Sequence, residues 1–185
     1  YGIKTRYGAE SGFTTDQIRD KNGNVITLNL VLSILEEAVS SLKPDDAKFI
    51  RYALDIAASE MYIPEIDMYY IGPEAAGNND GLVTNEQFTQ YKLELFKKYP
   101  RFISCEDWAD EGKIEHWNDA KMIMDDMIQM GDDNVVSKAD LIRKYKDVMN
   151  AHLQKPNQSG EESVSLAAVA TSHNLGNVVV WSHRG

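Results

Sequence analysis

The sequence predicts an α/β fold in which parallel strands alternate with outer helices, in the arrangement of a barrel. Two observations predict it. Short apolar runs alternate with segments of helical spacing along the chain, without an internal repeat. Several of these runs also end in a charged or imidazole residue, and in a parallel barrel the functional side chains lie at the C-terminal ends of the strands. A doubly wound open sheet is the alternative, but it usually carries a glycine-rich phosphate turn after its first strand, and no convincing one is found here.

The first half of the chain shows this alternation. We expect a short strand over residues 1–7, an exposed loop over 13–26, a helix over 28–42 and a strand over 48–55. Residues 62–73 are expected to form an irregular hairpin or excursion. Thr84 then begins a helix, because Gln87 stands three residues later as in a capping box. That helix runs to about Lys98, where Tyr99 and Pro100 stop it.

The second half continues the alternation. Strands are expected over residues 101–105, 127–130, 151–154 and 177–181. The helices expected between them span residues 112–125, 137–148 and 161–174. Ser137 is expected to cap one of these helices, and Gly176 to close the last of them.

Length and composition restrict the class of protein. The 185 residues suit one domain or a large piece of one, and the 43% hydrophobic content is enough for a core. No apolar run approaches the eighteen or so residues of a membrane span, so we expect no membrane partner. The net charge of −10 argues against a nucleic-acid partner, which usually binds a basic surface. The single cysteine, Cys105, fits a reducing compartment, and we expect a cytoplasmic location.

Three carboxylates are the first candidate site residues. Asp55, Glu106 and Asp132 each follow an apolar run, so they would meet at one rim of a parallel barrel. Like charges at that range repel strongly in a partly buried site, and a divalent cation removes the conflict. Oxygen ligands suit Mg²⁺ with water completing its shell. The alternative interpretation is three ordinary solvated acids in loops.

Four further residues complete the candidate site. Lys155 follows a strand and could act as a general base, because bound cations and burial favour its neutral form. Glu10, in a small-residue turn, could be the complementary acid, and His183 with Arg184 suggests an anion clamp after an apolar run. The alternatives are a solvated lysine, a loop carboxylate and a structural histidine.

Six segments follow the motifs of one known family, in that family's order. Asp55–Tyr62 matches its Asp-(Val/Cys)-Ala-(Ala/Ser)-Ser-Glu-Phe-Tyr, and Gly131–Val136 corresponds to its Gly-Asp-Asp-Leu-x-Val. The other four segments are Tyr1–Phe13, Tyr99–Asp107, Gln154–Gly160 and Trp181–Arg184. On these motifs, essentially the whole chain resembles the C-terminal barrel domain of enolase.

The resemblance implies an incomplete TIM-type, enolase-like barrel over residues 1–185. The N-terminal domain, the first strands and the last strand and helix would be absent, so the rest of the fold or another chain would have to close the barrel. The family dehydrates 2-phosphoglycerate, a small phosphorylated carboxylate, to phosphoenolpyruvate with two Mg²⁺. By resemblance Asp55, Glu106 and Asp132 would bind Mg²⁺, and Lys155 would be the base. Glu10 would assist loss of the hydroxyl, while His183 and Arg184 would hold the substrate.

The chain departs from the family's motifs at four positions beside the candidate residues, namely Ala9, Ser11, Trp108 and Pro156. These departures favour a second hypothesis: an enolase-like structural subunit that has kept the fold and lost turnover. A ciliary or cytoskeletal complex is one location for such a subunit. A homodimer or a larger assembly is compatible with either hypothesis.

Overall fold

The computed structural model describes residues 6–7, 13–14, 19–23, 25–118 and 138–182. The chain divides into two compact units, Tyr1–Ile50 and Arg51–Gly185. The predictions for a strand over 127–130 and for a cap at Ser137 lie outside the described residues.

The first unit holds a helix that the sequence predicted. Strand β1 (Arg6–Tyr7) pairs antiparallel with β2 (Phe13–Thr14), and helix α1 (Leu28–Ser40) follows. The Thr27 hydroxyl accepts a hydrogen bond from the Leu30 N–H at 3.2 Å and so caps α1. A one-turn helix, α2 (Pro44–Ala47), follows with proline at its first position.

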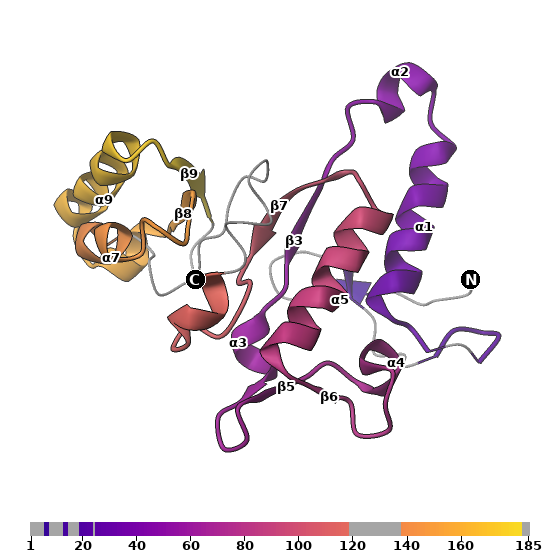
Figure 1. Cartoon of the computed structure of the whole chain (residues 1–185). Coiled ribbons are helices and arrows are strands. Elements are labelled where there is room, and N and C mark those ends of the chain that lie inside the picture. Colours follow the sequence, from indigo (N-terminus) through magenta and orange to yellow (C-terminus); the bar gives the residue numbers. More distant parts are fainter. Residues whose placement is uncertain (1–5, 8–12, 15–18, 24, 119–137, 183–185) are drawn as a thin grey trace. The chain divides into compact units, whose positions relative to one another are not determined.

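A pair of parallel strands lies at the centre of the second unit (Figure 1). Strand β3 (Tyr52–Asp55) pairs with β7 (Phe102–Glu106). The two strands end in register, with Asp55 directly opposite Glu106. Both strands end at the acidic residue predicted from sequence, which confirms these two elements and their parallel direction.

Helix α5 (Asn85–Lys98) connects these strands and packs on them. The predicted capping box is present, because the Thr84 hydroxyl accepts from the Gln87 N–H while the Gln87 side chain accepts from the Thr84 N–H. Phe96 contacts Phe102 of β7 at a ring-centroid distance of 5.0 Å. Phe88 joins Cys105 and Trp108 in the hydrophobic core of this unit. The βαβ crossover is therefore held by apolar contacts along the whole helix.

A small antiparallel sheet lies between β3 and α5 in the sequence. After the one-turn helix α3 (Ala58–Met61), strands β4 (Tyr62–Ile63) and β5 (Met68–Tyr70) form the predicted hairpin. The one-turn helix α4 (Pro73–Ala76) follows, and β6 (Leu82–Val83) then pairs with β5 as a third strand that the sequence did not reveal. Two residues are too short a stretch for periodicity to identify.

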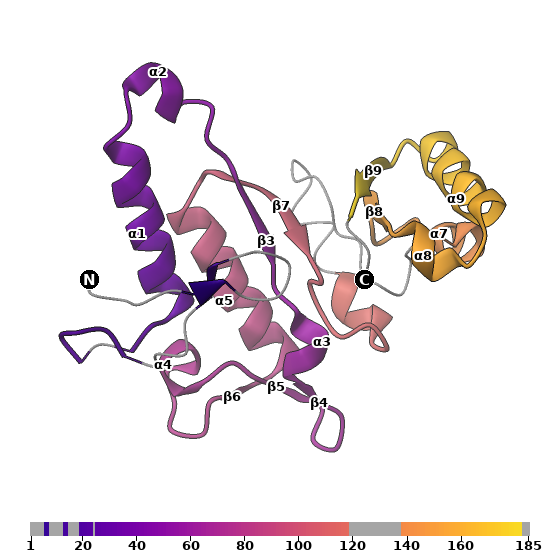
Figure 2. The same ribbon diagram turned by 180° about the vertical axis from the view of Figure 1, so that it is seen from behind.

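The end of the chain repeats the parallel arrangement (Figure 2). Strand β8 (Ala151–Gln154) pairs in parallel with β9 (Val178–Trp181). Between them lie the one-turn helix α8 (Pro156–Ser159) and helix α9 (Glu162–Asn174), and α7 (Ala139–Lys144) packs against α9. These elements confirm the strands expected over 151–154 and 177–181 and the helix expected over 161–174.

Of the helix expected over 112–125, the structure describes only residues 112–118. They hold the 3₁₀ helix η2 (Ile114–Trp117), and Asn118 after it is helical. Helix α7 ends at Lys144, although apolar spacing predicted a helix through Val148. Tyr145 and Val148 instead follow in turns, where Val148 joins the core.

The two parallel pairs, each joined by a helical crossover, are barrel elements. Among the residues that the structure describes, the strands do not close into a barrel, which agrees with the incomplete barrel expected from sequence. No described helix is both long enough and apolar enough to cross a membrane.

Candidate active site

The ends of β3 and β7 form one side of a pocket of about 200 Å³. Asp55 and Glu106 are cross-strand neighbours there, and Lys155, the residue after β8, lines the same pocket. The lining residues are Asp55, Ala57, Ser59, Glu60, Glu106, Asp107, Glu111 and Lys155. The structure thus brings together three of the residues that the sequence singled out.

Both strands leave the sheet through a left-handed residue. Ala57 has φ 51° and Asp107 has φ 50°, a conformation that costs about 1–2 kcal/mol for a residue with a side chain. An Asp55 carboxylate oxygen accepts a hydrogen bond from the Ala57 N–H at 2.9 Å. The Ile56 N–H donates to the Glu106 carbonyl at 3.1 Å, so the strand ends remain paired as they turn. These bonds hold the two carboxylates beside each other.

Asp107 is a site residue that the sequence analysis did not single out. Its side chain is buried in the pocket wall and accepts hydrogen bonds from the Ser59 N–H at 3.3 Å and the Ser59 hydroxyl at 3.2 Å. Burial raises the pKa of Asp107 to about 6, while the Ser59 hydrogen bonds oppose that rise. The available signal was its place directly after Glu106, at the end of an apolar strand.

A buried lysine lies behind this strand end. The Lys92 ammonium donates to the Trp108 carbonyl at 2.6 Å and lies 3.9 Å from the centre of the Trp108 ring. The Phe88 ring is also close, with 4.1 Å between Nζ and the ring centroid. Burial lowers the pKa of Lys92 to about 7, which the nearby negative charge of Asp107 partly opposes. Lys92 therefore fixes the turn that follows Glu106.

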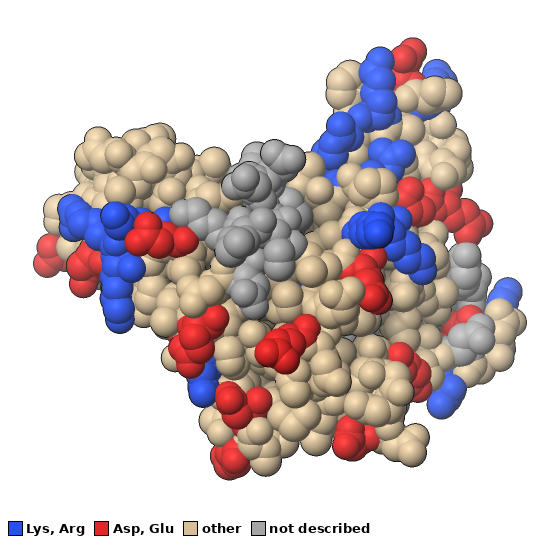
Figure 3. Space-filling model, viewed as in Figure 1, with Lys and Arg blue, Asp and Glu red and all other residues tan. Residues whose placement is uncertain are grey.

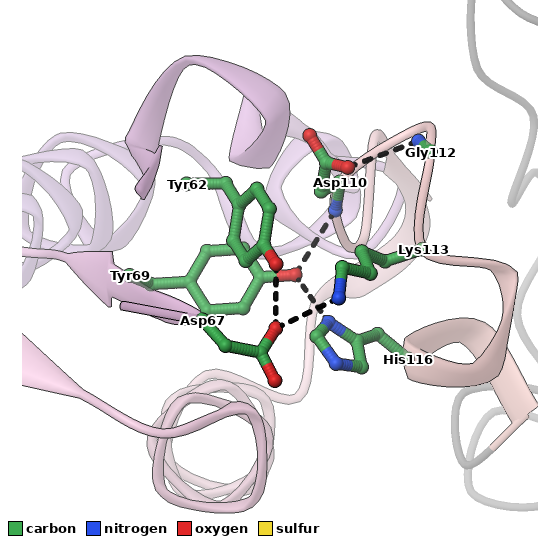
Figure 4. Close-up of polar contacts among 7 residues, drawn as sticks. All are labelled: Tyr62, Asp67, Tyr69, Asp110, Gly112, Lys113 and His116. Carbon is green, nitrogen blue, oxygen red and sulfur yellow. Dashed lines mark hydrogen bonds and ion pairs between the residues drawn. The ribbon is translucent and has the colours of Figure 1, made fainter. Parts of the chain in front are cut away.

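A polar cluster holds the segment from Asp110 to His116 against the small sheet (Figure 4). The Tyr69 hydroxyl accepts from the Asp110 N–H at 3.1 Å and contacts His116 Nδ1 at 2.8 Å. Asp67 accepts from the Tyr62 hydroxyl at 2.5 Å and pairs with Lys113 at 3.0 Å.

Burial shifts the pKa values of two side chains in this cluster. Burial raises the pKa of Tyr69 and lowers that of His116. Because the cluster anchors this segment at both ends, it also sets the position of Glu111, whose N–H donates to Ser59 in the pocket wall.

The remaining predicted site residues lie outside the described part of the chain. They are Glu10, Asp132, His183 and Arg184. Within the described residues, no group of three or more His, Cys, Asp or Glu side chains is arranged to hold a metal ion. Asp55 and Glu106 supply two neighbouring carboxylates, and this oxygen donor set is the type that Mg²⁺ prefers. The two described residues of the predicted three-ligand set therefore fit a magnesium site that needs a further ligand.

Charges of both signs are interspersed on the face of the molecule drawn in Figure 3. On the face shown in Figure 3, described Lys and Arg side chains occur in separate groups with Asp and Glu between them. The net charge of the chain is −10. An acidic site such as the Asp55–Glu106 pair therefore needs a bound cation before it can hold an anionic ligand.

The comparison with known families found a match for this chain. A family model described as the enolase C-terminal TIM barrel domain matches residues 2–185. The match spans nearly the whole chain, including every element that contributes to the pocket. The chain belongs to the enolase family, as a portion of its C-terminal TIM barrel domain.

Proposed function

We propose that the chain carries the active site of a Mg²⁺-dependent lyase in the cytoplasm that dehydrates 2-phospho-D-glycerate to phosphoenolpyruvate, as in glycolysis. The observation that carries the proposal is the single pocket shared by Asp55, Glu106 and Lys155. Removing a proton next to a carboxylate requires a base on one side and positive charge near the carboxylate. Lys155 provides the base, and the paired acids Asp55 and Glu106 in the same pocket provide a place for the positive charge.

Asp55 and Glu106 would hold the cation, with Asp132 as the third protein ligand. When bound, Mg²⁺ supplies the positive charge that stabilises negative charge developing on the substrate carboxylate. The chain's own residues do the rest. Lys155 takes the proton from the carbon beside the carboxylate, Glu10 protonates the departing hydroxyl, and His183 with Arg184 binds the phosphate or carboxylate.

Turnover of 2-phosphoglycerate by the full-length protein in Mg²⁺ tests this proposal, with phosphoenolpyruvate followed by its ultraviolet absorbance. Lys155→Ala should lower kcat by at least about a hundredfold, the lower range for a general base. Lys138→Ala removes an exposed lysine that does not line the pocket, so it should leave kcat unchanged.

Activity that survives Lys155→Ala would remove the lysine from the mechanism. An inactive wild-type protein that still binds Mg²⁺ would favour the second hypothesis, a structural subunit of a larger assembly. Two sequence departures beside the site support that alternative. Trp108 follows Glu106–Asp107 as a fully buried side chain, and Pro156 restricts the backbone of Lys155.

A further inference from the structure

A chain of buried polar side chains joins β8 to helices α8 and α9. His152 and Gln154 project from one side of β8, and Ser165 and Ser172 meet them from α9. At most 5% of any of these four side chains is exposed. The contacts run from Ser172 to His152, then to Gln154 at 2.9 Å, to Ser165 at 2.9 Å and to Ser159 of α8 at 2.8 Å.

Two backbone carbonyls beside Ser159 indicate the direction of these bonds. The Ser159 hydroxyl donates to the Pro156 carbonyl at 2.7 Å, with the Glu161 carbonyl at 3.2 Å as a second acceptor, so we infer that it accepts from the Ser165 hydroxyl. Ser165 in turn accepts from the Gln154 amide nitrogen, which leaves the amide oxygen to accept from His152 Nε2. His152 Nδ1 then accepts from Ser172.

The direction of these bonds sets the state of His152. The ring is neutral and carries its proton on Nε2, in keeping with burial that lowers the pKa of His152. Every buried side-chain polar group in the chain of bonds therefore has a partner.

The chain of bonds ends at the turn that carries Lys155. Gln154 is the last residue of β8, and its carbonyl accepts from the Ser182 N–H at 3.1 Å. The Lys155 carbonyl accepts from the Gln158 N–H at 3.0 Å, and Ser159 binds the carbonyl of Pro156. Because successive side chains of an extended segment alternate, fixing Gln154 towards α9 directs Lys155 to the opposite side, where it lines the pocket.

Polar groups in this layer are costly unless all are satisfied. Apolar side chains could fill the space between β8 and α9 without needing hydrogen-bond partners. A fully satisfied polar network, in contrast, fixes the side chains in a single arrangement. We propose that the hydrogen-bonded chain Gln154–Ser165–Ser159 positions Lys155 for proton abstraction, with Gln154 as the positioning residue closest to it. This inference rests on the proposed role of Lys155 as the base.

Two substitutions test the proposal. Gln154→Leu removes the central link with little change in volume, and Ser159→Ala removes the outer link at a partly exposed position where folding is tolerant. Both should lower kcat about tenfold or more while KM changes little, because a small displacement of a catalytic group is costly. Ser159→Thr keeps the hydroxyl and should restore kcat.

A second readout does not need turnover. The rate at which an acylating reagent modifies the Lys155 amine, relative to exposed Lys138, is measured by mass spectrometry of peptides at one pH. Gln154→Leu and Ser159→Ala should change that ratio, because the turn that holds Lys155 is released. Ser172→Ala is the matched control, since it removes a buried hydroxyl of the same network at the end furthest from Lys155.

The outcomes separate this inference from the proposed function. If the wild-type protein is inactive, the proposed function fails, yet the acylation ratio still reports whether Gln154 and Ser159 position Lys155. An unchanged ratio in both variants would overturn the inference. It would also be overturned if Ser172→Ala, at an equal loss of thermal stability, changed the ratio as much as Gln154→Leu, because the network would then act only on overall stability.

Discussion

Lys92 is the residue whose surroundings differ most from those of an ordinary side chain of its type. It is 1% exposed, its ammonium lies close to two aromatic rings and it donates to one backbone carbonyl. Spacing within α5 gave no sign of this, because a lysine in an amphipathic helix normally faces water. The burial of Lys92 is a consequence of Trp108 and Cys105 packing over the helix, contacts that are distant in sequence.

The pKa of Lys92 predicts how stability depends on pH. Its pKa is lowered to about 7 in the folded protein from 10.5, so between these values the unfolded chain binds the extra proton. The free energy of unfolding should therefore rise with pH across this window, by at most about 1.4 kcal/mol per pH unit. Lys92→Met should abolish this contribution, and exposed Lys98→Met should not. Urea unfolding at a series of pH values measures the free energy of unfolding against pH. If that free energy depended on pH equally in both variants, Lys92 would not be the source of the effect.

Tyr69 is the residue that joins the small sheet to the segment beside the pocket. Tyr69→Phe keeps the ring contact with Phe88 but leaves the Asp110 N–H without its acceptor. We expect a loss of about 1–3 kcal/mol in the free energy of unfolding. Neighbouring Tyr70→Phe, at a side chain that is 51% exposed, is the control and should change stability little. Thermal or urea denaturation of the two variants measures their stability. Equal losses of stability in Tyr69→Phe and Tyr70→Phe would show that the Tyr69 hydroxyl contributes nothing.

At the scale of elements, the βαβ unit of β3, α5 and β7 positions the site. The sequence predicted all three elements, because each strand is a short apolar run that ends in an acidic residue and α5 begins with a capping box. It could not predict that the chain passes through a left-handed residue just after each strand, since alanine rarely adopts that conformation and aspartate does so only occasionally. Pairing between the strands past their ends fixes those angles.

The capping box of α5 gives a prediction at this scale. Thr84→Ala removes the acceptor of the Gln87 N–H and should lower the free energy of unfolding by about 1 kcal/mol. Thr84→Ser keeps the hydroxyl and should retain most of that stability. Hydrogen exchange of the first-turn amides of α5 measures the effect locally, and unchanged protection in Thr84→Ala would rule out the box as a stabilising element.

For the whole molecule, the proposed site predicts that Mg²⁺ stabilises the fold. Ligand at a hundred times its Kd adds about 2.7 kcal/mol to the free energy of unfolding. Asp55→Asn and Glu106→Gln should lose that gain, whereas Glu65→Gln, at an exposed position outside the pocket, should keep it. Asp132→Asn tests the sequence-based ligand in the same way. Melting temperatures with Mg²⁺ and with a chelator are the measurement, and equal shifts in all variants would exclude this site.

The sequence alone determined the α/β class, the order of most elements, the family resemblance and the acidic ends of two strands. These depend on local period and on short motifs, which a linear chain displays directly. Only the tertiary structure decided that Asp55 lies opposite Glu106, that Lys155 shares their pocket, and that Asp107 and Lys92 are buried beside it. Register and burial depend on contacts between residues far apart in the sequence, and no local pattern encodes which of them meet.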